Sequence, residues 1–291
     1  HQAALYTNST LALNPINGEI IWHFQHVPGE TIDMEVGFER ILIDEEPTDK
    51  GRMLYTIGKD GILWKLNRTN GAFLALHEIL PQNIYQSVNR KTGKLIYRKD
   101  ILDASLNEPF TACPGIYGGH NWQAASYDKT ENALIIPMHQ LCSDMVGREV
   151  EKREGGGGFG GDSKTYVMPG ASERVGKLVA INLDKLQEKW SHEQEAMFLT
   201  SALSTAGKLT FIGDLDRYFK AFDSSTGKIL WKTRLGSALH GFPITYGVEG
   251  RQFVSVTTGM GVFRALTSTV SPDIYQPDGG NTIYVFELSQ Q

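Results

Sequence analysis

The stretch FKAFDSSTGKILW, residues 219–231, decides the expected fold because it has the form of a β-hairpin. Asp223 can cap the turn through its side chain, and Gly227 can adopt the positive φ angle that other residues avoid. β-branched and aromatic residues on both sides of the turn favour paired strands. The stretch therefore predicts two antiparallel strands joined by a tight turn.

The same phrase recurs along the chain: a polar Asn or Asp, a turn ending in Gly, and then an apolar strand. Clear copies begin at residues 11, 63, 85 and 219, and weaker copies begin at residues 124 and 178. The copies at 178 and 219 lie 41 residues apart, the length of a four-stranded propeller blade. Such repeats stack so that each one covers a face of its neighbour. We therefore expect an all-β propeller with four or five blades.

The segments between the repeats are expected to be long loops, at 25–62, 98–122 and 143–177. No ten-residue window is convincing as an amphipathic helix. The best candidate, NLDKLQEKW at 182–190, is explained equally well by a hairpin.

The chain begins inside a blade, and NTIYVFEL at 281–288 has the pattern of a closing strand. We expect residues 1–291 to form a single β-propeller domain. This domain is expected to be the C-terminal portion of a larger propeller whose N-terminal blades are absent.

Composition excludes several classes of protein. A net charge of −5 without a basic run argues against nucleic acid or an anionic membrane as the main partner. No apolar stretch reaches about 18 residues, so no membrane span is expected. The first residues lack the pattern of a signal peptide. The only cysteines, Cys113 and Cys142, form no CxxC pair, which argues against a structural zinc site or covalently attached haem.

One loop carries an unusual concentration of acidic residues. After an apolar strand, the stretch IIWHFQHVPGETIDMEVGFERILID at 20–44 places Glu30, Asp33 and Glu35 within six positions. The plain interpretation is a solvated turn, because surface loops commonly carry charge. The alternative is a catalytic or metal-binding loop.

The segment Ala221–Trp231 resembles the tryptophan-docking repeat A-x-D-x-x-T-G-x-x-x-W of pyrroloquinoline quinone (PQQ) dehydrogenases. These are periplasmic quinoproteins, such as methanol and ethanol dehydrogenases, built as eight-bladed β-propellers. The resemblance follows family order along the chain, through GKDGILWKLNRTNG, CPGIYGGHNWQAASYD, GFPITYGVEGRQFVSVTTG and NTIYVFEL. It implies an all-β propeller of the eight-bladed quinoprotein type, with this chain supplying about half of the blades.

The resemblance also gives the acidic loop a function. It implies that Asp33 is the catalytic base and stands beside a metal ion, either Ca²⁺ or a lanthanide. A carboxylate can take the hydroxyl proton as a hydride leaves an alcohol for PQQ. Glu35 stands where lanthanide-using members carry an extra carboxylate, usually Asp, so it is a second candidate metal ligand.

Four further residues are candidates for binding PQQ. Lys59 stands where the family places Arg or Lys against the quinone oxygens; the alternative is a simple turn lysine. Asn121 and Trp122 follow a Gly-Gly turn, although Trp122 could instead be a blade-docking aromatic. TTGMGVF at 257–263 resembles a glycine loop at the quinone edge, with Phe263 as its aromatic.

Other residues receive structural roles from the resemblance. Trp22, Trp190 and Trp231 are assigned to blade docking. Cys113 and Cys142 are 29 residues apart, as are paired cysteines in the methanol dehydrogenase branch, which implies a disulfide flanking one blade. The alternative is two buried thiols. The family resemblance implies a periplasmic location.

The expected function is that of a PQQ-dependent alcohol dehydrogenase, an enzyme acting on a small alcohol or aldehyde. Cytochrome c or a similar carrier would accept the electrons. The adjacent-cysteine disulfide, a stacking tryptophan and further metal ligands of the family belong to the missing N-terminal half, so this chain alone is expected to bind PQQ poorly. The alternatives are a propeller scaffold of the outer-membrane-assembly lipoprotein type, or a degenerate quinoprotein without a cofactor.

Overall fold

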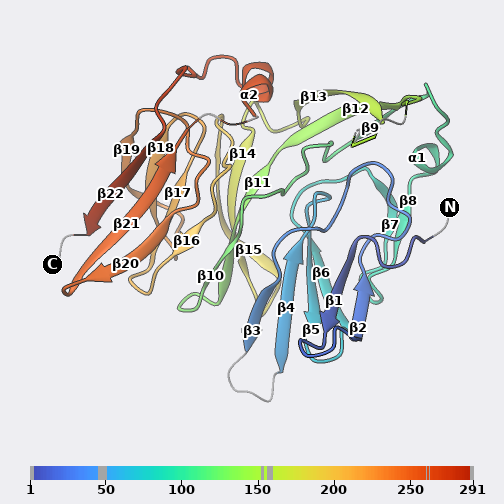
Figure 1. Ribbon diagram of the computed structural model, residues 1–291, viewed down its shortest axis with the longest axis horizontal. Coiled ribbons are helices and arrows are strands. Elements are labelled where there is room, and N and C mark those ends of the chain that lie inside the picture. Colours follow the sequence, from blue (N-terminus) through green and yellow to red (C-terminus); the bar gives the residue numbers. More distant parts are fainter. Residues whose placement is uncertain are drawn as a thin grey trace. The chain divides into compact units, whose positions relative to one another are not determined.

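The structure, a computed structural model, describes residues 3–44, 51–151, 154–155, 160–259, 261 and 263–288. These residues form many strands and only two short helices (Figure 1), so the predicted all-β class is confirmed. No helix among them is long and apolar enough to cross a membrane. The chain divides into two compact units: His1–Asn121 with Leu141–Met168, and Trp122–Gln140 with Pro169–Gln291.

The first unit is built from four antiparallel sheets. Their strand orders are β1-β2, β3-β4-β5-β6, β7-β8 and β13-β12-β9. The elements are β1 (Ser9–Leu13), β2 (Ile20–Gln25), β3 (Ile41–Asp44), β4 (Arg52–Ile57), β5 (Ile62–Asn67), β6 (Phe73–Glu78), β7 (Tyr85–Val88), β8 (Leu95–Tyr97), α1 (Lys99–Asp103), β9 (Pro109–Ala112), β12 (Leu141–Gly147) and β13 (Gly161–Val167).

The second unit contains two four-stranded sheets and one three-stranded sheet. Their orders are β10-β11-β14-β15, β16-β17-β18-β19 and β20-β21-β22. The elements are β10 (Ser126–Asp128), β11 (Ala133–His139), β14 (Gly176–Asn182), β15 (Gln187–Gln194), β16 (Leu203–Ser204), β17 (Leu209–Gly213), β18 (Tyr218–Asp223), β19 (Ile229–Arg234), β20 (Ile244–Val248), β21 (Arg251–Thr258), α2 (Arg264–Val270) and β22 (Thr282–Leu288).

The prediction of long loops at 25–62, 98–122 and 143–177 was wrong. These segments hold β3 and β4, then α1 and β9, then most of β12 and all of β13. The sheet β13-β12-β9 was not predicted, because β9 and β12 are about 30 residues apart in the sequence. No hairpin turn connects them directly, so the sequence gives no local signal of the pairing. NLDKLQEKW is the turn and start of the β14–β15 hairpin, as one of its two interpretations predicted.

Helix α2 was not predicted either. Its sequence RALTSTV contains two threonines and a valine, which are weak helix formers. The helix is nevertheless amphipathic, because Leu266, Thr267 and Val270 are buried on one side. Packing of that side, which local propensity does not report, stabilises the helix.

The tryptophan of the repeat connects neighbouring sheets, as the docking assignment of Trp22 and Trp190 predicted. The indole N–H of Trp22 donates to the Arg68 carbonyl at 3.1 Å, and that of Trp190 donates to the Ser224 carbonyl at 2.8 Å. Each acceptor lies in the Gly-ended turn of the next four-stranded sheet. The third candidate, Trp231, is partly exposed and packs edge-on against Phe286.

Each docked indole lies against the glycine that ends the turn. A Cβ atom at Gly71 or Gly227 would stand 2.5 Å from the Trp22 or Trp190 ring. Both glycines also have positive φ angles, of 72° and 71°. Glycine is therefore required twice over, for backbone conformation and for the close approach of the indole.

A matched pair of substitutions separates these two requirements. Gly227→Ala should destabilise the protein by roughly 2 to 5 kcal/mol, since it combines left-handed strain with overpacking against Trp190. Gly18→Ala should cost only about 1 to 2 kcal/mol, because Gly18 has a similar φ of 75° and nothing within 4 Å of the added Cβ. Urea denaturation of both variants measures the difference, and equal losses would show that indole docking contributes nothing.

Candidate functional site

The acidic loop follows β2, which ends at Gln25. Ile32, Met34 and Val36 of this loop are buried, whereas the residues between them are partly exposed. These intervening residues are Asp33 and Glu35. Asp33 has a φ of 66°, a left-handed conformation that Asp tolerates better than most residues.

Glu30 holds the backbone of the acidic loop through one of its carboxylate oxygens. One of its carboxylate oxygens accepts the backbone N–H groups of Ile32 at 2.5 Å and Met34 at 2.9 Å. Burial raises the pKa of Glu30, and these two hydrogen bonds partly offset the rise. Of Glu30, Asp33 and Glu35, Glu30 is therefore the carboxylate that shapes the backbone of the loop.

Lys59 brings the remaining two carboxylates together. Its ammonium lies 2.9 Å from Oδ2 of Asp33 and 3.0 Å from Oε1 of Glu35. The lysine belongs to the turn between β4 and β5, and its backbone N–H donates to the Glu35 carbonyl at 3.0 Å. Its side chain is only 7% exposed, whereas that of Asp33 is 44% exposed. The site thus presents one accessible carboxylate held by a buried cation.

Glu35 differs from Asp33 in its surroundings. Burial raises the pKa of Glu35, and the Lys59 ammonium partly reverses this effect. The second oxygen of Glu35, Oε2, is buried without a hydrogen-bond partner. An unpaired buried carboxylate oxygen is costly, and a cation would satisfy it.

The described residues contain no group of three or more His, Cys, Asp or Glu side chains placed to hold a metal ion. Asp33 and Glu35 have the oxygen chemistry that hard cations prefer, yet they are only two residues, and Ca²⁺ commonly takes six to eight oxygens. The donor set fits part of a metal site.

The Gly-Gly turn before Asn121 packs against Lys59. Gly118 has a φ of 75°, and a Cβ there would stand 2.6 Å from Cγ of Lys59. The backbone N–H of Gly119 donates to the Lys59 carbonyl at 2.6 Å. The turn therefore closes over the stem of the lysine and fixes its direction.

Asn121 follows this turn and is almost fully buried. Its amide nitrogen donates to the Tyr117 carbonyl at 3.0 Å, while Oδ1 has no partner. A buried acceptor without a donor is uncommon in proteins. It marks a place where a polar ligand group would be favourable.

Trp122 and Phe263 lie in the second unit and contact one another. Their ring centroids are 5.4 Å apart with the rings nearly edge-on. Trp122 is 61% exposed, whereas Phe263 is buried at the start of α2. Met260 and Val262 of the predicted glycine loop lie outside the described residues. The buried Phe263 ring thus packs against the exposed indole of Trp122.

Two important residues of the site carry no obvious sequence signal. Arg40 donates to the Val36 carbonyl at 2.7 Å, to Thr10 Oγ1 at 2.7 Å and to Thr56 Oγ1 at 3.1 Å, and so holds the end of the acidic loop. Asp60, next to Lys59, is completely buried, and burial raises its pKa to about 7. A charged residue beside a predicted turn is too common to identify either one.

Asp60 fixes the lysine turn from below. Its carboxylate accepts the Ile62 N–H at 3.0 Å and the Tyr85 hydroxyl at 3.0 Å. Gly58 allows this arrangement, because a Cβ there would stand 2.6 Å from Val36 and 2.8 Å from Asp60. The turn and the acidic loop are therefore packed as one piece.

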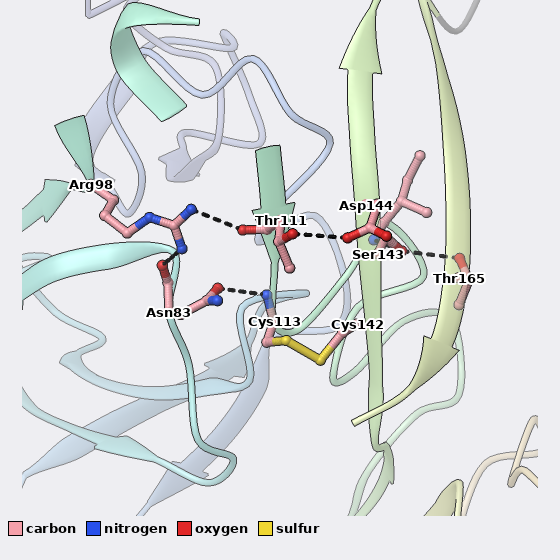
Figure 2. Close-up of a disulfide and its surroundings, with 9 residues drawn as sticks. Asn83, Arg98, Thr111, Cys113, Cys142, Ser143, Asp144 and Thr165 are labelled. Atoms are coloured by element: carbon pink, nitrogen blue, oxygen red, sulfur yellow. Dashed lines mark hydrogen bonds between the residues drawn. A yellow bond between two sulfur atoms is a disulfide. The ribbon is translucent and has the colours of Figure 1, made fainter. Parts of the chain in front are cut away.

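Cys113 and Cys142 form the expected disulfide. Figure 2 shows it joining the exit of β9 to β12, so the bridge lies within the sheet β13-β12-β9 and not at the two ends of a blade. The backbone N–H of Cys113 donates to the Asn83 side chain at 2.7 Å. Arg98 donates to the carbonyls of Asn83 at 2.7 Å and Thr111 at 3.1 Å.

Side-chain hydrogen bonds next to the disulfide also join β9 to β12 and β12 to β13. Thr111 of β9 donates to the Asp144 carboxylate of β12 at 2.8 Å, and Ser143 is 3.0 Å from the Thr165 hydroxyl of β13. The disulfide and these bonds hold the three strands as a rigid unit. This sheet forms one wall of the cavity beside Asp33.

Comparison with known proteins identifies a family. The family model described as PQQ glucose/ethanol/alcohol dehydrogenase, β-propeller domain, matches residues 1–81 and 83–254. The quinohemoprotein alcohol dehydrogenase of Comamonas testosteroni is 30% identical over 294 residues, which are 98% of this chain and 40% of that protein. The quinoprotein ethanol dehydrogenase of Pseudomonas aeruginosa is 29% identical over 296 residues, 98% of this chain and 47% of that protein.

Solved structures agree on the fold. A europium-containing methanol dehydrogenase has a TM-score of 0.88 at 23% identity, covering 97% of this chain and 53% of that one. The crystal structure of quinohemoprotein alcohol dehydrogenase from Comamonas testosteroni has a TM-score of 0.81 at 27% identity, covering 98% and 43%. The chain spans about half the length of the proteins that it matches.

Proposed function

This chain belongs to the PQQ family of glucose/ethanol/alcohol dehydrogenase β-propeller domains, and from that membership we propose that it forms the catalytic portion of a quinoprotein oxidoreductase. The proposed reaction transfers a hydride from a primary or secondary alcohol, or from an aldehyde, to metal-bound PQQ. The observation that carries the proposal is the cluster of Asp33, Glu35 and Lys59. It combines an accessible carboxylate, a buried carboxylate oxygen without a partner and a buried cation.

Asp33 is the proposed catalytic base. Its carboxylate is accessible, and Lys59 holds one of its oxygens at 2.9 Å, which leaves the other oxygen to accept a hydroxyl proton. The substrate loses this proton to Asp33 and a hydride to the acceptor, so that an alcohol becomes an aldehyde or a ketone. A base positioned in this way typically contributes 10²- to 10⁴-fold to the rate.

The chain offers groups that suit a bound quinone and cation. When bound, PQQ accepts the hydride, and a Ca²⁺ or lanthanide ion polarises its carbonyl group. We assign the unpaired Oδ1 of Asn121 and the Lys59 ammonium, both in the first unit, to the quinone. Glu35 and Asp33 are assigned to the cation. The remaining ligands would come from the part of the propeller that this chain does not contain.

Partners and location follow from the same membership. The small-molecule substrate would be an alcohol, and the name quinohemoprotein of the Comamonas relative pairs the quinone with haem. We therefore propose cytochrome c or a similar haem carrier as electron acceptor. The disulfide favours an oxidising compartment, which supports the periplasm.

The alternative of a cofactor-free propeller scaffold explains less. A scaffold gains nothing from an unpaired buried oxygen on Glu35 or from a similar oxygen on Asn121, since each destabilises the folded state. The site therefore favours the enzyme.

Reconstitution of the complete protein tests the proposal. PQQ with Ca²⁺ or a lanthanide should support alcohol oxidation coupled to an artificial electron acceptor. Glu35→Ala should weaken lanthanide binding roughly tenfold or more, because partners of a metal site are commonly worth about 10- to 100-fold in affinity. The loss should be smaller for Ca²⁺, since the higher lanthanide charge depends more on each anionic ligand.

Glu19→Ala is a suitable control, because Glu19 is an exposed residue of the β1–β2 connection whose side chain accepts a hydrogen bond from Asn17. Metal titration followed by activity gives the two affinities. Equal metal affinities for the Glu35 variant and the control would remove Glu35 from the metal site. Absence of alcohol oxidation with every combination of quinone and metal would refute the proposed function itself.

A further inference from the structure

A second cavity, of about 330 Å³, lies within the first unit and shares no lining residue with the cavity beside Asp33. Its lining comes from two segments, within residues 24–28 and 92–97. The first segment is the end of β2 and the residues after it, and the second is the turn and second strand of the β7–β8 hairpin. Sites for small molecules typically have volumes of about 300 to 1,000 Å³. The cavity is therefore large enough for a small organic ligand.

Much of the wall of this second cavity is hydrocarbon. Tyr97 belongs to the buried core cluster of the first unit, and Phe24 and Leu95 pack against that cluster. The Phe24 ring is stacked on that of Phe73, with the centroids 6.1 Å apart. Phe73 in turn lies against Gly93 of the hairpin turn, where an added Cβ would be 2.7 Å from its ring. The body of a ligand would therefore lie against side chains that are already fixed by packing.

The charge of the cavity is positive. Lys94 is an exposed residue of the lining, and no Asp, Glu or Arg is found among the described residues that line the cavity. On the same hairpin Arg90 pairs with Glu78 at 2.6 Å, whereas Lys94 forms no ion pair within the described part of the chain. An anionic group at this position would meet a cation and no competing carboxylate.

His26, another lining residue, supplies a hydrogen-bond donor that lacks an acceptor. Its Nε2 is 2.7 Å from Thr10 Oγ1, while the buried Nδ1 has no partner among the described residues. Thr10 Oγ1 already accepts the Nε–H of Arg40 at 2.7 Å, so its own hydrogen is free to be donated to Nε2. Burial lowers the pKa of His26 to about 3, so the ring is neutral and its one hydrogen is then on Nδ1. A buried N–H without an acceptor is costly, and an oxygen atom of a ligand would satisfy it.

We propose that this second cavity is a binding site for a small carboxylate with an apolar or aromatic body. One carboxylate oxygen accepts the Nδ1–H of His26, and the other faces the ammonium of Lys94. The body lies against Phe24, Leu95 and Tyr97. The inference goes beyond the proposed function and does not depend on it, because no residue assigned to the base, the quinone or the metal lines this cavity.

Three benzene derivatives that differ in charge test the ligand class. Benzoate, benzamide and benzylamine are titrated at pH 7 and low ionic strength into the complete protein without quinone or metal, and binding is followed by NMR. Benzoate should bind most tightly. Lys94→Gln should weaken benzoate binding up to about fivefold, the scale of an exposed ion pair, and leave benzamide unchanged. Lys91→Gln is the matched control, because Lys91 is exposed in the same turn but does not line the cavity. Equal effects of the two lysine variants, or binding of benzamide or benzylamine as tight as that of benzoate, would overturn the ligand class.

A second measurement tests the position of the ligand. With ¹⁵N-labelled histidine, benzoate should shift the Nδ1 resonance of His26, which is identified by its loss in the His26→Gln variant. The resonances of His23, at an exposed position of β2, should stay in place. In the Lys94→Gln variant the same shift should require a higher benzoate concentration. An unchanged His26 resonance at saturating benzoate would refute this site.

Discussion

Asp33→Asn should reduce turnover of the complete, reconstituted enzyme roughly 100-fold or more, the scale expected when a general base is removed. The amide keeps the shape of the side chain, and its oxygen can still accept a hydrogen bond from Lys59, whose ammonium lies 2.9 Å from Oδ2. It cannot take a proton from a hydroxyl group. The loss should therefore fall on kcat at saturating substrate, quinone and metal.

Two measurements make this prediction specific. A metal titration separates loss of the base from loss of a ligand, because a ligand defect is recovered at high metal concentration. Asp44→Asn is the control, since Asp44 is also exposed and ion-paired, with Arg68 at 2.5 Å, but lies at the end of β3. Normal turnover by the Asp33 variant under saturating conditions would show that Asp33 is not the base and would favour the alternative interpretation of the acidic loop as a solvated turn.

Stability should fall steeply below pH 6.5 because of His26. This histidine is buried at the start of the acidic loop, with Nε2 2.7 Å from Thr10 Oγ1. Burial, with a smaller contribution from the charge of Arg40, lowers its pKa from 6.5 to about 3. The folded state therefore favours the neutral ring, and the unfolded state binds the extra proton between these two values.

The sign follows from this difference. The stability that neutral His26 contributes is complete above pH 6.5 and is lost as the pH falls from 6.5 toward 3. The slope contributed by one such group is up to about 1.4 kcal/mol per pH unit. His26→Gln should remove that slope, whereas His23→Gln, at an exposed position of β2, should keep it. Urea denaturation from pH 7 to 4 gives the slopes, and parallel curves for the wild type and the His26 variant would contradict the assignment.

The repeated hairpins could be predicted because their chemistry is local. Asn67 and Asp223 accept backbone N–H groups of their own turns, from Thr69 and Ser225, each at 2.8 Å. The glycine that closes each turn follows four residues later. All of these partners lie within one short window of sequence.

The sheet β13-β12-β9 could not be predicted in the same way. Its central strand, β12, pairs with β9, which lies about 30 residues earlier in the sequence, and with β13. The residues between β12 and β13 do not contain the Asn/Asp and Gly turn of the repeat. Pairing over such distances is decided by tertiary packing. The part of the lining of the cavity beside Asp33 that this sheet provides could therefore not be predicted from the sequence.

The candidate site was predicted in its members and only partly in its geometry. Asp33, Glu35 and Lys59 were all identified, but nothing in the sequence indicated that one ammonium would bridge both carboxylates. The same is true of Arg40, whose guanidinium donates to Thr10, Val36 and Thr56 on three separate segments. Candidate ligand-binding residues could be recognised from sequence motifs. The residues that hold them in place are determined by tertiary packing, which the sequence does not show.

The packing of an indole on a glycine turn runs in one direction along the chain. In both fully docked cases the tryptophan comes first and the glycine turn belongs to a later sheet: Trp22 reaches Gly71, and Trp190 reaches Gly227. In these two pairs the docking indole and the glycine turn that receives it are different parts of the repeat, so the contact runs in one direction along the chain. Reversing the order of either pair of sheets would separate the indole from its glycine turn.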